Sequence, residues 1–464
     1  MSTFQNDSIK EKVRKQMSKP RDYSWITKDK LMLYTFIALA VLTGISTISF
    51  GIDPVIIAVI AVGLAVVMDF GLSKIVSDSK LNIGSAAVFG LIVTDSYTLG
   101  LPTLGAAATY PLNVTMQGNG LYLYPALITI VGMILFKKAL NAKGRKYVNP
   151  AATAKLIVLV FLVAVALTPT EHTIMFPNLA SSLTLDKAPA GSMIPPFGLA
   201  IQQCFGKDFT AFNPDFTTFK TSSDADVLQT LVIQKYHGWI GGVSSIAVLA
   251  VGIALFAILR RYVKWRITLA YLVTVAIVAV IMAVGYGDTD MLLRPAFQLF
   301  IGSSIFLAFF MATDPASTPL TYIGQSIFGV GLGVLSVLIV TYMNGFFGGS
   351  ILALVIMNLV SPFLDRAGRL KPTTESHEPK LPKPMQQTSV NTYDCMRCGA
   401  CMRVCCHRLS PILIKQAFDK TDVETLSKLN ADYCTGCGHC SYVCPSRIDL
   451  KGAVLRSKAM LRQE

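Results

Sequence analysis

The sequence predicts an all-α polytopic membrane protein of about ten transmembrane helices, followed by a small cysteine-rich domain. Of the 464 residues, 52% are hydrophobic and 15% are charged, whereas charged residues make up about 25% of a typical soluble domain. Nine of the ten cysteines lie between Cys395 and Cys444, and Cys204 stands alone. This composition excludes a disordered chain, a coiled coil and a small secreted scaffold.

Residues 1–30 form a basic arm that contains eight lysines and arginines and no apolar run. Such an arm is not a signal peptide, and we expect it to stay in the cytoplasm. Apolar segments of about the length of one helical span follow, and they cover residues 31–50, 54–72, 82–100, 120–136, 149–168, 238–259, 267–285, 294–312, 323–343 and 346–363. An even number of spans places both termini on the same side of the membrane.

The lysines and arginines between the segments are distributed unevenly. They are dense in the loops that the ten-span topology places inside, at Lys74, Lys80, Lys137, Lys138, Lys143, Arg145, Lys146, Arg260, Arg261, Lys264 and Arg266. The predicted outside turns near 51–53, 101–119 and 344–345 have none, and the long loop at about 169–237 is more acidic than basic. Because basic residues accumulate on the cytoplasmic side, both termini are predicted to be cytoplasmic, in the cell membrane. The net charge of +14 therefore reports topology, and we do not expect nucleic-acid binding.

Two of the apolar segments resemble each other in sequence. The third contains I-G-S-A from Ile83 and the eighth contains I-G-S-S from Ile301, and each continues through an apolar stretch to Thr-Asp and a proline-containing end. An internal repeat of five plus five spans would invert the second copy, because five is odd. The alternative is that a short apolar pattern recurs by chance.

A polar linker at 365–393 leads to the cysteine-rich domain at 394–464, which contains the spacing C-x-x-C-x-x-C-x-x-x-C twice. This is the bacterial ferredoxin pattern, in which the fourth cysteine of each motif ligates the other cluster. The sequence thus predicts a bacterial-ferredoxin-like domain with two 4Fe–4S clusters. By this rule the first cluster is held by Cys395, Cys398, Cys401 and Cys444, and the second by Cys434, Cys437, Cys440 and Cys405.

Zinc and disulfides are the alternative uses of these cysteines. Zinc sites commonly use two separated pairs, and a reducing cytoplasm disfavours disulfides, so both are weaker interpretations. Cys406 occupies the place where a proline usually follows the first motif. It is either an alternative ligand or a free thiol. Basic residues around the motifs, such as Arg397 and Arg403, would attract an acidic electron carrier, or they are ordinary surface charges.

Three sequence stretches resemble a known family. Asn149-PAATAKL, Gly84-SAAVFGLIVT and Met311-ATDPASTPLTYIGQ are similar to the D subunit of the Rnf electron-transport complex and to the B subunit of the sodium-pumping NADH:quinone reductase. The cysteine-rich tail resembles the ferredoxin segment of the Rnf C subunit. The resemblance covers most of residues 30–365 and implies a D-type membrane body fused to a C-type iron–sulfur tail.

The resemblance implies a subunit of an ion-translocating oxidoreductase that is not catalytic alone. Electrons would pass between the cytoplasmic clusters and a flavin in the membrane or outside it, coupled to Na⁺ or H⁺ translocation. The other subunits of the complex and a soluble ferredoxin, or a similar carrier, would be the partners. Two alternatives remain: a channel or transporter whose tail senses redox state, and an electron conduit to an extracytoplasmic acceptor that pumps no ion.

The family also implies FMN linked covalently to a threonine within D-x-x-(S/T)-(G/A)-A-T in the long outside loop. The corresponding stretch here is Asp224-ADVLQT, in which Asp224 and Thr230 keep their places while Val227, Leu228 and Gln229 replace small residues. The alternative is an ordinary amphipathic approach to the membrane. Haem is disfavoured, because the five histidines form no transmembrane pair.

A non-covalent flavin or a cation could instead bind at the ends of the two similar segments. The polar residues available there are Thr313, Asp314 and Ser317 in one segment and Thr94, Asp95 and Ser96 in the other. The alternative is that both aspartates cap helices.

Overall fold

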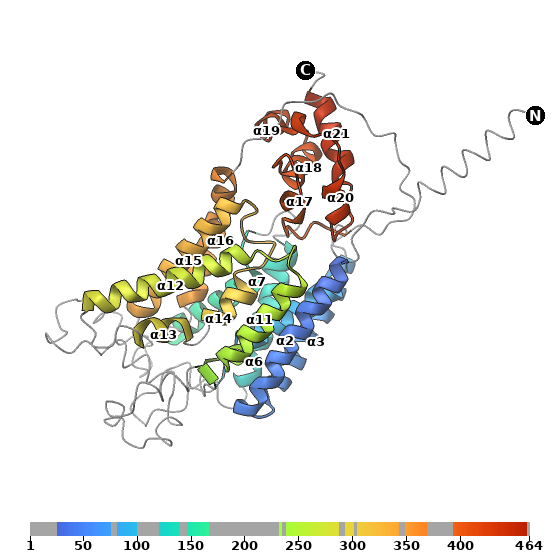
Figure 1. Cartoon of the computed structure of the whole chain (residues 1–464). Coiled ribbons are helices and arrows are strands. Elements are labelled where there is room, and N and C mark those ends of the chain that lie inside the picture. The colour runs from blue at the N-terminus through green and yellow to red at the C-terminus, as the bar shows by residue number, and fades with distance from the viewer. Residues whose placement is uncertain are drawn as a thin grey trace, which may run out of the picture. The chain divides into compact units, whose positions relative to one another are not determined.

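The computed structural model describes residues 26–75, 81–99, 120–139, 147–166, 232–233, 238–286, 293–300, 304–342, 349–368 and 393–461 (Figure 1). These residues belong to two compact units. The first is the membrane unit, Met32–Ala367, and the second combines Met1–Leu31 with Gly368–Glu464.

Helices occupy each of the ten segments predicted to span the membrane. They are α2 (Lys28–Phe50), α3 (Asp53–Ile75), α4 (Ile83–Asp95), α6 (Gly120–Val131) with η1 (Gly132–Ala139), α7 (Pro150–Ala166), α11 (Ser245–Ile258), α12 (Trp265–Tyr286), α13 (Leu293–Phe300), α14 (Ser304–Phe306) with η6 (Leu307–Met311), α15 (Tyr322–Tyr342) and α16 (Gly349–Ala367). Within the described residues, four of them, α2, α3, α12 and α15, contain stretches long and apolar enough to cross a membrane, and α4, α6 with η1, and α11 contain shorter apolar stretches. The predicted all-α polytopic membrane class is confirmed.

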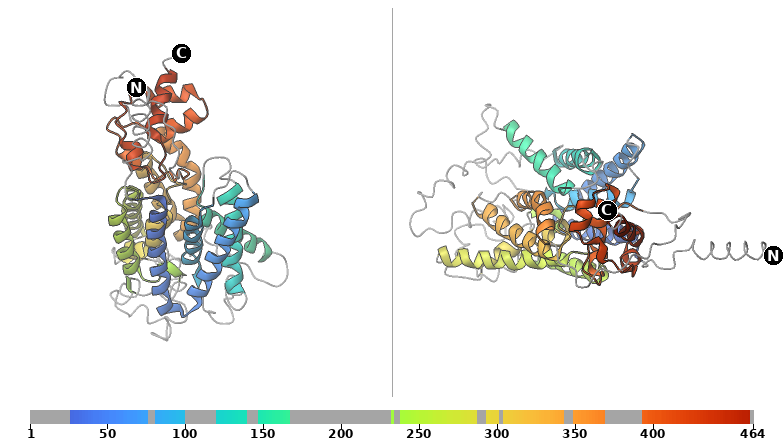
Figure 2. Two further views of the ribbon diagram at one scale, coloured as in Figure 1. Left: turned by 90° about the vertical axis from the view of Figure 1, so that its right-hand side faces the viewer. Right: turned by 90° about the horizontal axis from the view of Figure 1, so that it is seen from above.

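The helices of the membrane unit form two packed groups. In the first, α3 packs against α4 and α6, and α6 packs against α7. In the second, α15 packs against α12 and α16, and α13 lies on α12. Figure 2 shows the groups side by side, the first in blue to teal and the second in yellow to orange. The two groups meet where α7 of the first packs against α16 of the second.

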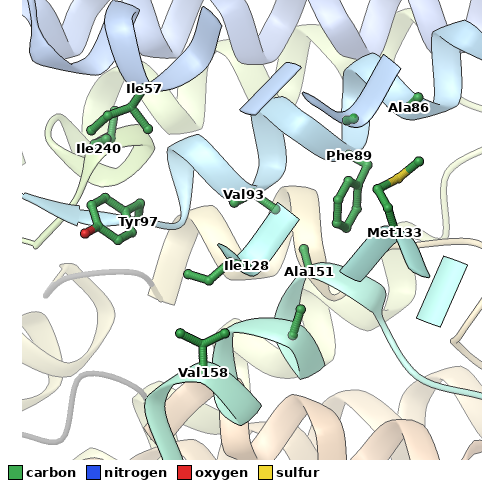
Figure 3. Packing of buried hydrophobic residues seen from close by; sticks show 12 residues of the cluster. Ile57, Ala86, Phe89, Val93, Tyr97, Ile128, Met133, Ala151, Val158 and Ile240 are labelled. Carbon is green, nitrogen blue, oxygen red and sulfur yellow. The ribbon is translucent and has the colours of Figure 1, made fainter. Parts of the chain in front are cut away.

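Apolar side chains from four segments of the first group fill its core. Ile57 of α3, Phe89 of α4, Met133 of η1 and Ala151 of α7 are buried in one cluster (Figure 3). Large apolar side chains are also exposed on the outer helix faces, including Val59 at 68% and Ile281 at 63%. A lipid environment covers such surfaces without cost, since the acyl chains are as apolar as the side chains.

The two similar segments differ in length by one residue, and the structure shows where the extra residue is accommodated. The second copy has one residue more than the first between its Ile-Gly-Ser and its Thr-Asp. The first copy forms the regular helix α4, whereas the second contains the π-helix η6, in which the Ala312 N–H donates to the Leu307 carbonyl, five residues earlier, at 2.7 Å. A π-turn absorbs one extra residue within a helix. In the expected span at 294–312 the described residues form α13 at the start and α14 followed by the π-helix η6 at the end.

Short strands accompany the helices. β1 (Thr98–Leu99), directly after α4, pairs antiparallel with β2 (Gly238–Trp239). The 3-10 turn η5 (Ile240–Gly242) follows β2 and leads to α11, whose first turn is capped by the Ser244 hydroxyl, which accepts from the Ala247 N–H at 3.4 Å. The pairing holds the entrance to α11 against the end of α4.

The second unit contains the cysteine-rich domain. Its helices are α17 (Ala400–Arg403), α18 (Pro411–Asp419), α19 (Val423–Lys428), η7 (Ala431–Tyr433), α20 (His439–Val443) and α21 (Leu450–Leu461). Leu409, Ile414, Leu426 and Val454 form its small apolar core. The unit also includes the described residues 26–31, where the Lys28 backbone N–H donates to the Pro445 carbonyl at 3.1 Å.

Candidate functional site

The two cysteine motifs follow the same backbone path. Left-handed φ angles occur at three matched positions in each motif: Arg397 (55°) and Gly436 (75°), Gly399 (73°) and Gly438 (83°), and Arg408 (56°) and Arg447 (54°). Residues other than glycine adopt this region infrequently. Its recurrence at matched positions shows that the two motifs form equivalent loops, each followed by a short helix, α17 or α20, and then by a longer one, α18 or α21.

The turns direct backbone N–H groups at cysteine sulfurs. The Arg397 N–H donates to Cys395 Sγ at 3.3 Å, and the matched Gly436 N–H donates to Cys434 Sγ at 3.4 Å. Hydrogen bonds to the sulfurs are among the features by which a protein sets the properties of an iron–sulfur cluster. The loop geometry therefore fits an anionic group bound by these thiolates.

The thiols lie in two groups, each of which crosses from one motif to the other. Cys444 is close enough to interact electrostatically with Cys395, Cys398 and Cys401. In the same way Cys405 interacts with Cys434, Cys437 and Cys440. Cys401 also interacts with Cys440 of the other group, so the two groups adjoin each other. The interactions include those that a pair of clusters with exchanged fourth cysteines requires, and the eight residues fit such a pair.

The thiols differ in exposure: Cys398, Cys401 and Cys444 are buried, and the others are partly or fully exposed. Burial raises the pKa of Cys398 and of Cys440 to about 12. The nine cysteines of the domain are free thiols. Among the residues that the structure describes, no three His, Cys, Asp or Glu side chains are grouped so as to hold a single metal ion, whereas a cluster of four irons presents a larger core to its ligands.

Cys406 lies beside the second ligand set. Its Sγ is 4.0 Å from Cys437 Sγ, and both side chains are exposed. The next residue, His407, has its Nε2 2.8 Å from the Thr435 hydroxyl. This position is compatible with an alternative ligand and with a spectator thiol, and the two interpretations predict different iron contents.

Each ligand set has a basic side chain bonded to the backbone of one of its cysteines. A guanidinium nitrogen of Arg403 donates to the Cys398 carbonyl at 3.1 Å, and Lys458 Nζ donates to the Cys434 carbonyl at 3.0 Å. The sequence reasoning named Arg403 and missed Lys458. Helical spacing offered a signal, because Lys458 is four residues after Val454 and three before Leu461, on the apolar stripe of α21.

In the membrane unit, the structure joins two of the sequence stretches on which the family resemblance rests. The Asn149 side-chain oxygen caps α7 by accepting from the N–H groups of Ala151 (3.1 Å) and Ala152 (3.3 Å), while its Nδ2 donates to the Met311 carbonyl at 3.3 Å. Buried Lys264 donates to the Pro315 carbonyl (2.9 Å) and to both oxygens of Thr318. The loop after η6 is thus fixed from two sides.

The two aspartates of the similar segments have different environments. Asp314 accepts from the Ser317 hydroxyl at 2.9 Å and from the Ala316 N–H at 3.4 Å, and Thr313 donates to the Phe309 carbonyl at 2.6 Å. These contacts are those of a local turn, and they favour the structural alternative for Asp314 and Thr313.

Asp95 is fully buried, and only one of its oxygens has a partner among the described residues. Oδ1 accepts from the Thr43 hydroxyl of α2 at 2.7 Å, whereas Oδ2 accepts from none. Ser96 follows Asp95 in the chain, and its carbonyl accepts from Lys155 Nζ. The same Nζ lies 4.4 Å from the centre of the Trp239 ring. A buried acceptor without a described partner therefore lies at the end of α4, whereas both Asp314 oxygens accept hydrogen bonds. Asp224 and Thr230 lie outside the described residues.

Comparison with known proteins extends the resemblance of the separate stretches to the whole membrane unit. The NQR2, RnfD, RnfE family matches residues 16–373, more than half of the sequence. The chain belongs to this family. The match ends before Cys395, so the cysteine-rich domain is additional to the part that the family shares.

Several relatives are named as D subunits of ion-translocating complexes. The chain is 32% identical over 142 residues to the D subunit of the ion-translocating oxidoreductase complex of Methanosarcina acetivorans, covering 31% of this chain and 45% of the relative. It is 28% identical to the D subunit of the Na⁺-translocating ferredoxin:NAD⁺ oxidoreductase complex of Acetobacterium woodii (52% and 65%). It is 25% identical to the D subunit of the proton-translocating ferredoxin:NAD⁺ oxidoreductase complex of Clostridium ljungdahlii (73% and 89%). In the first two comparisons the matched part is less than two thirds of the relative.

Proposed function

We propose that this chain is the membrane subunit of an Rnf-like redox complex and that it carries its own pair of 4Fe–4S clusters. The observation that carries this proposal is the crossed grouping of eight thiols in a chain whose membrane unit belongs to the NQR2, RnfD, RnfE family. Clusters of this kind supply one-electron transfer when bound. The protein itself orients the thiols, directs N–H groups at them and excludes water from the most buried ones.

Electrons would pass between the cytoplasmic clusters and a flavin in the membrane or outside it. The ion to which their movement is coupled is Na⁺ or H⁺: the names of the A. woodii and C. ljungdahlii relatives specify one each, so membership of the family does not select between them. The partners are the other subunits of the complex and an acidic one-electron carrier such as a soluble ferredoxin. Partly exposed Arg403 and exposed Lys451 provide positive charge that would attract it, whereas Arg397 is buried.

The excess of basic residues in the predicted inner loops supports an orientation with both termini in the cytoplasm. We therefore expect reduced ferredoxin to reduce the clusters in inside-out vesicles that contain the whole complex, and not in right-side-out vesicles. Cluster absorbance and ion uptake are measured together. Reduction in right-side-out vesicles only would contradict the orientation, and reduction without ion uptake would make the chain a conduit. Ion or solute flux without any electron donor would favour a channel or transporter.

A flavin bound covalently at Thr230 is the second part of the proposal. The spacing of Asp224 and Thr230 supports it, while the bulk of Val227 and Leu228 opposes recognition by a flavin transferase. We expect the denatured chain, co-expressed with the transferase, to show in-gel flavin fluorescence that is lost completely in Thr230→Ala. The iron content is the control and should not change. A wild-type chain without fluorescence would remove this role from Thr230 and leave a non-covalent flavin or a cofactor of a partner protein.

A further inference from the structure

The strongest unassigned feature of the cysteine-rich domain is the side chain of Lys458. It is 0% exposed, although lysines are almost never fully buried without a partner. Its Nζ donates at 3.0 Å to the carbonyl of Cys434, the first cysteine of the second motif. The ammonium group is also close enough to the Cys434 thiol to interact with it electrostatically. A positive charge is therefore enclosed beside the second ligand set.

The matched position in the first motif carries the opposite charge. Counted from the fourth cysteine of each motif, Cys405 or Cys444, the counterpart of Lys458 is Asp419. The Asp419 side chain is 52% exposed and pairs with Lys415 of the same helix at 2.5 Å. The two loops repeat their backbone conformation but not this lysine. The first ligand set has basic neighbours of its own, the buried Arg397 and Arg403, which donates to the Cys398 carbonyl, so the comparison at this position concerns Lys458 alone.

A fixed charge next to a cluster changes the free energy of its reduction. The incoming electron makes the cluster more negative, and a nearby positive charge stabilises that state. Salt screens a buried charge much less than a surface charge. Net charge and hydrogen bonds are among the factors that set cluster potentials. Lys458 meets these conditions at the second ligand set, and it is not itself one of the predicted ligands.

We propose that Lys458 raises the reduction potential of the cluster held by Cys434, Cys437, Cys440 and Cys405, and leaves the other cluster unaffected. This inference rests on the proposed binding of two clusters. Through Lys458, helix α21 would make the second cluster easier to reduce. An electron delivered by a soluble one-electron donor is thereby held more strongly at that cluster.

The experiment is an anaerobic redox titration of the full-length chain, followed by electron paramagnetic resonance. It is made in a Cys444→Ser background, which leaves the second cluster as the one that titrates. We expect Lys458→Met and Lys458→Gln to lower the midpoint potential of the second cluster by about 59 mV. This shift corresponds to a tenfold change in the equilibrium constant of a one-electron reduction. Glutamine keeps a hydrogen-bond donor and loses the charge, whereas Lys458→Arg keeps the charge and should keep the potential.

Two controls separate charge from structure. Lys428→Met removes an exposed lysine, 62% accessible and paired with Glu424, and should leave the midpoint unchanged. In a Cys434→Ser background, where the first cluster titrates, Lys458→Met should have no effect. Unchanged midpoints in Lys458→Met and Lys458→Gln, or an equal shift in Lys458→Arg, would overturn the inference, as would loss of iron from all three variants. A Cys444→Ser chain without about four irons would instead refute the clusters themselves.

Discussion

Replacing any one of the eight predicted ligands by serine should lower the iron content of the reconstituted chain from about eight to about four per chain. The thiols lie in two groups, Cys395, Cys398, Cys401 and Cys444 on one side and Cys434, Cys437, Cys440 and Cys405 on the other. Each group would hold one cluster, and loss of one thiolate removes or degrades that cluster alone. Iron and sulfide analysis after anaerobic reconstitution measures the effect.

Double substitutions test whether the fourth cysteines are exchanged between the motifs. Cys405→Ser with Cys434→Ser affects one group and should leave about four irons, whereas Cys405→Ser with Cys395→Ser affects both and should leave almost none. If each motif held its own cluster, the two results would be reversed. Cys406→Ser is the matched control, since its neighbour Cys405 is a predicted ligand. A loss of iron in Cys406→Ser would make Cys406 a ligand and would contradict its interpretation as a free thiol.

The sequence predicted the positions of the helices because each span is a long apolar run, and hydrophobicity alone identifies it. It did not predict the π-helix η6 at the end of the eighth segment. The extra residue before Thr313 is visible only when the two similar segments are compared residue by residue, and its conversion into a π-turn depends on backbone hydrogen bonds that no composition reports.

The polar residues show a second limit of sequence reasoning. Thr94-Asp95 and Thr313-Asp314 look alike, yet Asp314 is satisfied by its own turn, whereas Asp95 is enclosed by α2 and by the chain after β2. The difference comes from segments distant in sequence, Thr43 and Gly241 among them. Lys458 is the same case: its residue type suggests exposure, and only the packing of α21 against the Cys434 loop places it in the interior.

Gly90 of α4 lies where two helices pack closely, and we expect its substitution to have a large effect on stability. A Cβ atom added at Gly90 would lie 2.7 Å from Val62 Cα, 2.8 Å from Val62 N and 2.9 Å from the Ala61 carbonyl oxygen of α3. All three are backbone atoms, which cannot turn aside as a flexible side chain can. Gly90→Ala therefore forces α3 and α4 apart, and we expect it to lower the stability of the membrane unit by about 3 kcal/mol, near the upper end for overpacking.

Gly63 of α3 provides the matched control, because it lies one residue after Val62 and nothing is within 4 Å of its added Cβ. Alanine has the higher helix propensity, so Gly63→Ala should be neutral or stabilising by up to about 1 kcal/mol. The two variants make the same chemical change in neighbouring helices, and the sign of the effect should differ between them. Thermal unfolding of the purified chain in detergent measures both. Equal melting temperatures for Gly90→Ala and Gly63→Ala would show that α3 and α4 do not approach at Gly90 as closely as the structure indicates.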